Sequence, residues 1–227
     1  MIFPLLPAFI ASLGASPAFL GLIEGVADAT SSLLKLASGH VADRVTSRKP
    51  IVVFGYAIAA LSRPLVALAT APWHVLAIRA SDRVGKGLRA SPRDLLIANS
   101  VDTKDTGRAF GFHRAMDHTG AVVGPLIATA LLGAGVPLRT VFWLALVPGV
   151  LSVVAVLTVR EPAVDSKTLA HGEHVQRRNS LPVSLRTYLG ILAVFSLGNS
   201  TDAFLLLRAR DTGVSIVLLP LLWTVFP

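Results

Sequence analysis

The sequence contains no cysteine, which excludes disulfide bridges, thiolate metal sites and a cysteine nucleophile. It also has little charge: Asp, Glu, Lys and Arg make up 15% of the 227 residues, against roughly 25% in an average soluble domain. The opening stretch MIFPLLPAF has no basic region before its apolar run, so we expect no cleavable signal peptide. These absences argue against a secreted disulfide scaffold and against an ordinary soluble domain.

Hydrophobic residues dominate what the sequence does contain. They make up 53% of the chain and the mean hydropathy is +0.66, a balance typical of membrane proteins. In a soluble protein the net charge of +8 would suggest nucleic acid, but a membrane protein gains such charge from basic cytoplasmic loops. Because the basic residues fall in alternate links between apolar segments, we expect a lipid bilayer around the chain and no nucleic acid as a partner.

Six segments reach the length of about 20 residues that a helix needs to cross a bilayer. Short polar or turn-rich links separate them, so we predict an all-α, polytopic transmembrane helix bundle. Two further apolar stretches, 2–14 and 214–227, are too short to cross, and we interpret them as parts of cut helices. The predicted spans are 17–42, 50–70 with a kink at Pro64, 76–98, 108–133, 140–159 and 188–207.

The links between these spans differ in their basic content. Links 42–50, 100–108 and 160–186 hold ten Lys and Arg residues between them, whereas the links on the other side hold three. Cytoplasmic loops of membrane proteins carry the excess of Lys and Arg. We therefore predict that these three basic links lie on the cytoplasmic side.

The third predicted span carries much charge for a membrane helix. Residues 79–94, RASDRVGKGLRASPRD, contain five basic and two acidic side chains. At about 100° per residue, four of them fall within roughly 60° of arc, whereas Val84, Leu88 and Leu95 lie on the opposite face. A membrane helix with one wet face explains this segregation better than a solvated loop does. The four side chains are Asp82, Lys86, Arg89 and Arg93.

Three other predicted spans carry polar side chains in helical register. Charges at membrane depth cost several kcal/mol each unless they face one another or water. We therefore predict a common polar interior, which we interpret as a water-filled solute path, with a salt-bridge network closing the cytoplasmic end as the alternative. The residues of this predicted polar path are Glu24, Asp28, Asp82, Arg83, Lys86, Arg89, Arg93, Asp94, His113, Arg114, Asp117, Asn199 and Asp202.

Pairing within this interior decides what it could bind. Asp82 is expected to pair with Lys86 one turn on, and Asp94 with a basic residue of a neighbouring helix. The remaining arginines of 83–93 would then have fewer local partners, and unpaired arginine favours carboxylate or phosphate through its planar fork. Six bases and six acids are available in all, so we incline to a paired network, and an anion site stays open.

Three sequence patterns occur in the order and spacing of a known family. The link GHVADRVTSRK supplies the first, an early arginine followed by glycines in the third span supplies the second, and Gly-x-x-x-Gly-Pro in the fourth span the third. Together they resemble the major facilitator superfamily of secondary transporters, in a bacterial branch of undefined substrate. The residues are Gly39, Asp43, Arg44, Arg48 and Lys49 in the link, Arg79, Gly85 and Gly87 next, then Gly120, Gly124 and Pro125.

The resemblance implies a fold of two six-helix halves, with the link residues forming a gating loop and the last three residues packing helices. It implies ion-gradient-driven transport of a small molecule or ion, with the proton as one candidate, in the bacterial inner membrane. Residues 1–159 would be the N-terminal half with a truncated first helix, 160–187 a cytoplasmic central link, and 188–227 the start of the second half. Because the family's substrate site lies between the halves, activity would require the missing C-terminal half.

Other functional classes receive less support from the residues. A phosphate-binding loop is rejected, because Ala80 and Gly87 stand where its first glycine and its Ser or Thr are required, so we expect neither nucleotide nor other cofactor. His113, Asp117 and His118 could bind metal, but helical histidines are more often structural, and a His113–Asp117 proton relay is the better alternative. A membrane-embedded enzyme would need repeated aspartates around a metal, and an inactive gene fragment remains an alternative to a transporter.

Overall fold

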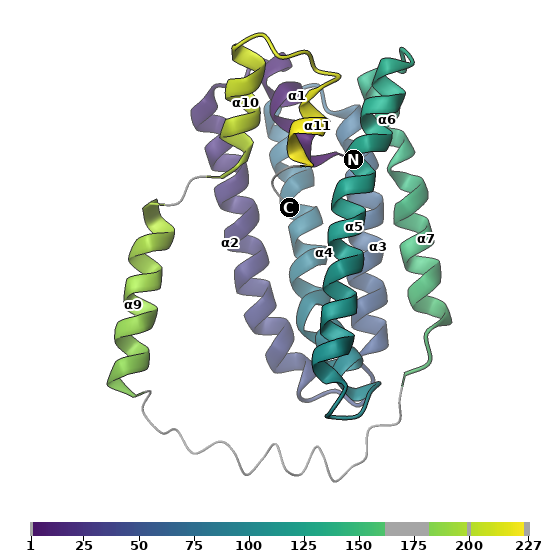
Figure 1. The fold of residues 1–227 in the computed structure, drawn as a ribbon, viewed down its shortest axis with the longest axis vertical. Coiled ribbons are helices and arrows are strands. Elements are labelled where there is room, and N and C mark those ends of the chain that lie inside the picture. Colours follow the sequence, from purple (N-terminus) through teal and green to yellow (C-terminus); the bar gives the residue numbers. More distant parts are fainter. Residues whose placement is uncertain (1, 162–181, 199–200, 225–227) are drawn as a thin grey trace.

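The computed structural model describes residues 2–161, 182–198 and 201–224. Within these ranges the chain forms helices and loops and no strand, which confirms the predicted all-α class. Long helices run side by side along the vertical axis of Figure 1. They are α2 (Pro17–Ala42), α3 (Lys49–Leu65), α4 (Pro72–Asn99), α5 (Thr106–Gly133) and α7 (Leu146–Thr158), which continues α6 (Leu138–Leu144).

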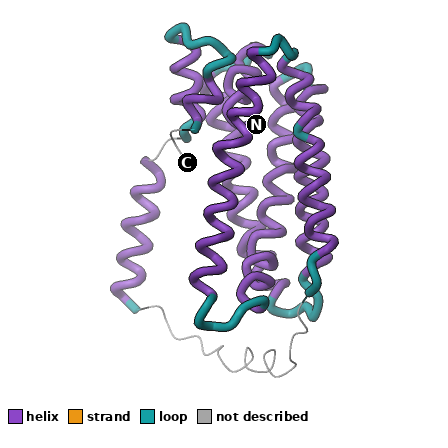
Figure 2. Tube along the Cα trace, turned by 45° about the vertical axis from the view of Figure 1, so that its right-hand side comes forward, coloured by secondary structure: helices purple, strands orange, loops and turns teal. Residues whose placement is uncertain are grey.

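Shorter helices gather at one end of this bundle. The first and the last described segments meet there, as the purple and yellow ribbons at the top of Figure 1 show. By contrast, α9 (Val183–Gly198) stands apart from the long helices in Figure 1 and Figure 2. The remaining elements are η1 (Phe3–Leu5), α1 (Leu6–Ser12), η2 (Val66–Leu68), α10 (Ala203–Asp211) and α11 (Leu219–Trp223).

Local sequence signals explain where the first long helix begins. Ser16 is the N-cap of α2, and its hydroxyl accepts a hydrogen bond from the backbone N–H of Phe19 at 3.3 Å. Pro17 follows at the first helical position, where its missing N–H costs nothing. Gly14, with φ of 82°, allows the chain to turn from α1 into α2. The predicted boundaries 17–42 are therefore confirmed.

The buried apolar core lies mainly at the end where the short helices gather. Phe9 of α1 packs edge-on against Phe142 of α6, with ring centroids 5.1 Å apart. Buried residues of α2, η2, α4 and α10 complete this cluster. They include Leu20, Ile23, Val66, Val75, Ala203 and Leu207. This apolar packing joins the long helices at that end of the bundle. Towards the opposite end, contacts other than this cluster hold them together.

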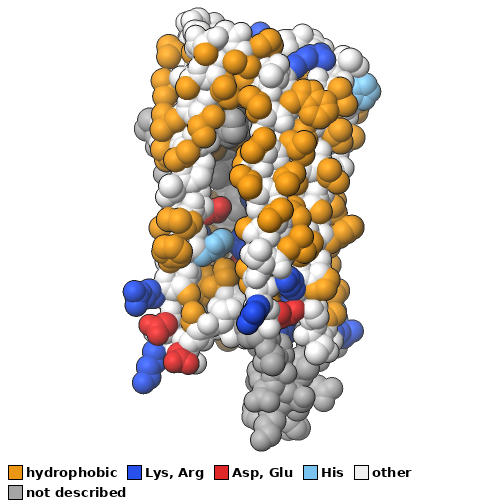
Figure 3. Space-filling view, turned by 90° about the vertical axis from the view of Figure 1, so that its right-hand side faces the viewer, with side chains coloured by type: hydrophobic (Ala, Val, Ile, Leu, Met, Phe, Trp, Pro, Cys, Tyr) orange, Lys and Arg blue, Asp and Glu red, His pale blue; other side chains and the backbone are white. Residues whose placement is uncertain are grey.

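Three stretches are long and apolar enough to cross a membrane, judged by length and composition within the described residues. They are Lys49–Leu68, Thr106–Gly133 and Leu138–Thr158. Many large apolar side chains point outward, and the face in Figure 3 is largely hydrophobic, with charged side chains gathered towards its lower end. α2 and α4 are as long but carry the predicted polar stripes. The chain is thus a polytopic membrane protein.

Two predicted segments differ from the structure. The predicted span 188–207 is not one helix: α9 ends at Gly198 and α10 begins at Ala203, with 199–200 outside the described residues. Thr201 and Asp202 lie outside both helices, and short polar side chains of this kind compete with helical hydrogen bonding. α9 also begins at Val183, inside the predicted link 160–187, most of which lies outside the described residues.

Candidate functional site

Glycines bring α4 into backbone contact with its two neighbours. A Cβ added to Gly85 of α4 would lie 2.5 Å from the carbonyl oxygen of Gly55 in α3. One added to Gly87 would lie 2.9 Å from the carbonyl oxygen of Ser31 in α2. Only glycine permits such close approach. The charged side chains of α4 therefore lie directly beside α2 and α3.

Arg79 and Glu24 form a buried ion pair between α4 and α2. Arg79 Nη2 donates to both carboxylate oxygens of Glu24, at 2.9 and 2.8 Å, and Arg79 Nε adds a bond of 3.2 Å. The side chains are only 11% and 4% exposed. The planar guanidinium satisfies the carboxylate at several points, which is the arrangement that lowers the cost of burying both charges.

Asp82 connects this pair to α3. Arg63 Nε donates to Asp82 Oδ1 at 2.9 Å, and Arg79 Nη1 lies 3.7 Å from Asp82 Oδ2. The predicted pairing of Asp82 with Lys86 is therefore wrong. The close approach of α3 at Gly55 brings Arg63 to the carboxylate, and a bond across helices replaces the one along the helix.

The next bases of α4 are held more loosely. Arg83 Nη2 lies 3.8 Å from Glu24 and 3.6 Å from Asp28, and its buried Nε donates to no acceptor among the described residues. Lys86 is exposed and forms no ion pair or hydrogen bond within the described ranges. Arg89 donates from Nη1 to the carbonyl of Gly55 at 3.1 Å.

Two further side chains complete the environment of these bases. The guanidinium of Arg89 lies over the ring of Tyr56, 4.5 Å from its centroid. Arg93 pairs with its own neighbour Asp94 at 2.9 Å, so the predicted pairing of Asp94 with another helix is wrong. The Asp94 carboxylate thus finds its basic partner in the adjacent residue of α4 and not on a second helix.

The predicted polar residues of α5 do not join this network. His113 is half-buried, Arg114 and Asp117 are exposed, and none of the three forms a side-chain hydrogen bond or ion pair within the part of the chain that the structure describes. Asp202 at the start of α10 is likewise exposed and unpaired there, and Asn199 lies outside the described residues.

The predicted packing residues of α5 differ among themselves. Pro125 is buried and Gly124 is half-buried. Gly120 faces open space, since an added Cβ would meet nothing within 4 Å. The closest helix contacts through glycine lie instead at Gly55, Gly85 and Gly87. The buried residues of α5 lie nearer its C-terminal end, at Pro125 and Ala128.

The predicted gating loop joins α2 to α3. Arg48 is buried, and its Nε donates to the carbonyl of Ala42 at 2.9 Å. Asp43 and Arg44 are exposed, and neither side chain forms an ion pair with a described residue. Gly39 lies beside Ser91 of α4: a Cβ added to Gly39 would lie 3.5 Å from the Ser91 hydroxyl oxygen. The loop's fixed part is thus its basic C-terminal end.

Glu161 holds that basic end. Its carboxylate accepts hydrogen bonds from the Ser47 hydroxyl at 2.7 Å and from the backbone N–H groups of Arg48 and Lys49 at 2.6 and 3.3 Å. In return Lys49 Nζ donates to the carbonyls of Leu157 and Val159 at the end of α7, both at 2.7 Å. An acid thus caps the N-terminus of α3 and a base caps the C-terminus of α7, which suits both helix dipoles.

These contacts shift the titration of the acid. Partial burial raises the pKa of the Glu161 carboxyl, but the hydrogen bonds from Ser47, Arg48 and Lys49 outweigh it. The pKa of Glu161 therefore lies below its usual range. Glu161 is charged at neutral pH in the folded protein, which keeps the two helix ends joined.

A sequence model of the Major Facilitator Superfamily matches residues 1–226. The chain belongs to this superfamily. An uncharacterized MFS-type transporter of Methanocaldococcus jannaschii is 30% identical over 93% of this chain and 52% of its own length. An uncharacterized protein of Mycobacterium tuberculosis is 29% identical over 90% of this chain and 52% of its own length. The chain spans about half the length of these relatives.

A third similar protein covers a smaller part of the chain. The multidrug resistance protein MdtH of Photorhabdus laumondii is 31% identical over 64% of this chain and 39% of its own length. Superfamily membership agrees with the resemblance drawn from the three sequence patterns.

Several residues of this superfamily member escaped the sequence-based prediction of the polar path. Arg63 and Tyr56 lie in an apolar span, and only the packing of α3 on α4 brings them to the charged face. Arg79 was identified as a family landmark but not as the partner of Glu24. Glu161 stands two residues after an apolar run, with Arg160 between, and an acid at the end of a span beside a basic link was the signal that could have found it.

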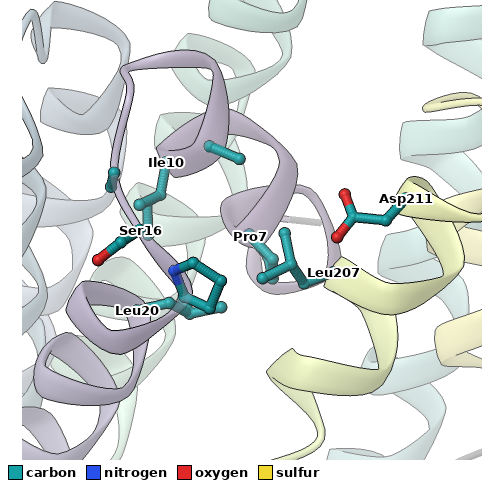
Figure 4. Close-up of a pocket in the computed structure, with 9 residues that line it drawn as sticks. Pro7, Ile10, Ser16, Leu20, Leu207 and Asp211 are labelled. Atoms are coloured by element: carbon teal, nitrogen blue, oxygen red, sulfur yellow. The ribbon is translucent and has the colours of Figure 1, made fainter.

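A separate pocket lies at the end where the short helices gather. Its empty volume is about 420 Å³ including its open mouth. Figure 4 shows Pro7, Leu20 and Leu207 lining it, with Asp211 of α10 at its edge. None of the charged residues of α4 lines it. The candidate site is therefore the charged face of α4 and not this pocket.

Proposed function

We propose that this chain forms the N-terminal half of a secondary transporter that moves a small solute across the membrane by alternating access. Membership of the superfamily supports the transport of a solute, and the lack of a nucleotide motif supports an ion gradient as the driving force. A proton gradient is our first candidate. Residues 1–159 would form this half, 160–187 the central link, and 188–227 the beginning of the second half.

The observation that carries the proposal is the ion network between α2, α3 and α4. Glu24 and Asp82 are buried carboxylates held by Arg79 and Arg63. Buried ion pairs add little to stability compared with apolar packing, which favours a role other than stability for this network. A transporter needs groups that exchange partners or protons as its two sides open in turn, and these carboxylates supply them.

The proposed gating role of the α2–α3 loop rests on which of its side chains already have hydrogen-bond partners. Glu161 and Ala42 hold the basic end of the loop, whereas Asp43 is exposed and unpaired among the described residues. We propose that Asp43 takes a basic partner when the cytoplasmic side closes. The same proposal places the basic links on the cytoplasmic side of a bacterial inner membrane.

The remaining predicted residues keep their proposed places in the path. His113 and Asp117 lie one turn apart on α5 and are accessible, which suits a proton relay. Activity would require the second six-helix half, because the solute site of such a transporter lies between two halves.

Reconstitution in liposomes tests the proposal. The chain is reconstituted alone and together with the second half of the Methanocaldococcus relative, and charge movement is recorded on a solid-supported membrane while a panel of solutes is added under an imposed pH gradient. With both halves present, we expect solute-dependent currents that vanish when an ionophore collapses the pH gradient. Solute accumulation that persists without any ion gradient would contradict the proposal.

A further inference from the structure

The bases of the charged face fall into two sets that differ in their partners. Arg63 and Arg79 each donate hydrogen bonds to a carboxylate. Lys86 and Arg89 form no ion pair with any carboxylate of the described residues. Arg83 lies between the two sets, near Glu24 and Asp28 but without a hydrogen bond to either. Positive charge is therefore left over in the middle of α4.

The three under-partnered bases lie on successive turns of one helix. Arg83, Lys86 and Arg89 are spaced three residues apart, which puts them on neighbouring positions of one face with about 4.5 Å of rise between them. Lys86 is the central member and is exposed. A small group placed over Lys86 would have Arg83 one turn before it and Arg89 one turn after it along α4.

The two arginines have donors to spare for such a group. Arg83 Nε is buried and donates to no acceptor among the described residues, a state that native proteins seldom leave unexplained. Arg89 uses one N–H for the carbonyl of Gly55, and its guanidinium carbon lies over the ring of Tyr56. The other N–H groups of this guanidinium form no hydrogen bond to a described residue, and a guanidinium with free N–H groups binds a carboxylate or phosphate.

The position of these bases makes a purely structural role expensive. Lys86 lies at the midpoint of α4, which runs from Pro72 to Asn99. A cation at the middle of a membrane helix costs about 3 kcal/mol on translocon-insertion scales unless it is paired or faces water. Nothing among the described residues pairs with Lys86, so water or an anion from outside the chain would meet its charge.

We infer that Lys86, Arg83 and Arg89 form a binding site for the carboxylate or phosphate group of a small anionic solute. This inference rests on the proposed transport function and names its substrate class. Asp28 is the acid that competes with the solute, since its Oδ1 lies 3.6 Å from Arg83 Nη2 and its side chain is 67% exposed. Tyr56 fixes Arg89 and is a positioning residue.

Equilibrium binding to the purified chain tests the inference without any transport step. Succinate and inorganic phosphate serve as anionic probes and choline as the cationic one, at constant ionic strength, in discs of neutral phosphatidylcholine. We expect the anions to bind and choline not to bind. Lys86→Gln should weaken anion binding about tenfold or more, the size expected for one charge-assisted hydrogen bond.

A matched control separates the site from overall charge. Lys104→Gln removes the same charge from the exposed link between α4 and α5 and should leave the dissociation constant within about twofold. Asp28→Asn should tighten anion binding, because it removes the competing carboxylate. Because Lys86 is exposed and unpaired among the described residues, Lys86→Gln should fold normally, which gel filtration and circular dichroism check.

Three results of the binding experiment would overturn the inference. One is anion binding that Lys86→Gln and Lys104→Gln weaken equally, another is preferential binding of choline. The third is anion binding lost when anionic phosphatidylglycerol replaces the neutral lipid, which would give the site to a lipid headgroup. Transport of a cation with no anion binding would refute this site and leave the transport proposal standing, whereas anion binding without ion-driven transport would do the reverse.

Discussion

α4 and α5 are both helices of 28 residues with polar side chains repeated along one face, yet they are integrated very differently. α4 is wedged between α2 and α3, and Glu24 and Arg63 from those helices neutralise its charges. α5 is buried at Pro125 and Ala128, while His113 and Asp117 remain unpaired among the described residues. A shared polar face therefore does not show whether a helix belongs to a network.

Small residues account for the difference. Gly85 and Gly87 allow the backbone of α4 to touch its neighbours, so charged side chains of adjacent helices meet. Gly120 of α5 has open space where a neighbour would be. The ion pairs of α4 therefore depend on the close approach of its backbone to α2 and α3. Matched changes in the packed helices and in α5 or its link test this contrast.

The largest expected effect comes from removing a buried carboxylate. Glu24→Gln leaves Arg79 buried without its charge partner and should lower the free energy of unfolding by about 3 kcal/mol. Asp117→Asn on α5 should leave stability unchanged, since Asp117 is exposed and unpaired among the described residues. Unfolding in mixed micelles measures both. Equal effects of the two changes would erase the contrast between the helices.

A methyl group added to glycine should act in opposite directions on the two helices. Gly85→Ala places a Cβ 2.5 Å from the carbonyl oxygen of Gly55 and should destabilise the protein by about 2 kcal/mol. Gly120→Ala meets nothing within 4 Å and should stabilise by up to about 1 kcal/mol through helix propensity. Thermal midpoints of the two variants provide the comparison, and a stabilising Gly85→Ala would refute the close approach.

The Glu161 cap between α3 and α7 should make the free energy of unfolding depend on pH. Because the pKa of Glu161 is lowered in the folded protein, its contribution is present above the ordinary pKa of a glutamate and is lost as the pH falls through the folded pKa. Glu161→Gln should cost about 1 kcal/mol at neutral pH and flatten this dependence.

The matched control for the cap is an acid in the α4–α5 link. Asp102→Asn removes an exposed carboxylate whose side chain forms no ion pair with a described residue. It should leave the acid branch of the stability curve unchanged. A curve that Asp102→Asn alters as much as Glu161→Gln would assign the pH dependence to net charge and not to the cap.

The smallest expected effect on stability is at Asp43. Asp43→Asn should change the unfolding free energy by less than about 0.5 kcal/mol, because the side chain is exposed and unpaired among the described residues. The proposed gating role predicts slower transport by the same variant in the reconstituted system. Unchanged transport kinetics would remove that role.

The positions of the long helices could be predicted from the sequence because hydrophobic length and caps are local signals. α2 begins and ends at the predicted residues, and α4 keeps its predicted stripe. The break between α9 and α10 was not predicted, since the apolar composition of 188–207 concealed the short polar residues within it. Composition over a window hides a local interruption.

The pairing of charges could not be predicted, because it depends on which helices touch. Spacing along α4 favoured Asp82 with Lys86, but Arg63 of α3 takes that carboxylate. The same exchange leaves Lys86 unpaired among the described residues. Periodicity predicts which side chains share a face, and only tertiary packing decides which of them meet.

A double-mutant cycle on Glu24 and Arg79 tests most directly the claim that α4's charges are neutralised across helices. The free energy of unfolding is measured for Glu24→Gln, Arg79→Gln and the double variant, with Arg114→Gln and Asp117→Asn on α5 as the parallel cycle. The account predicts a coupling of about 2 kcal/mol or more for the first pair and none for the second. Additive effects of Glu24→Gln and Arg79→Gln would contradict it.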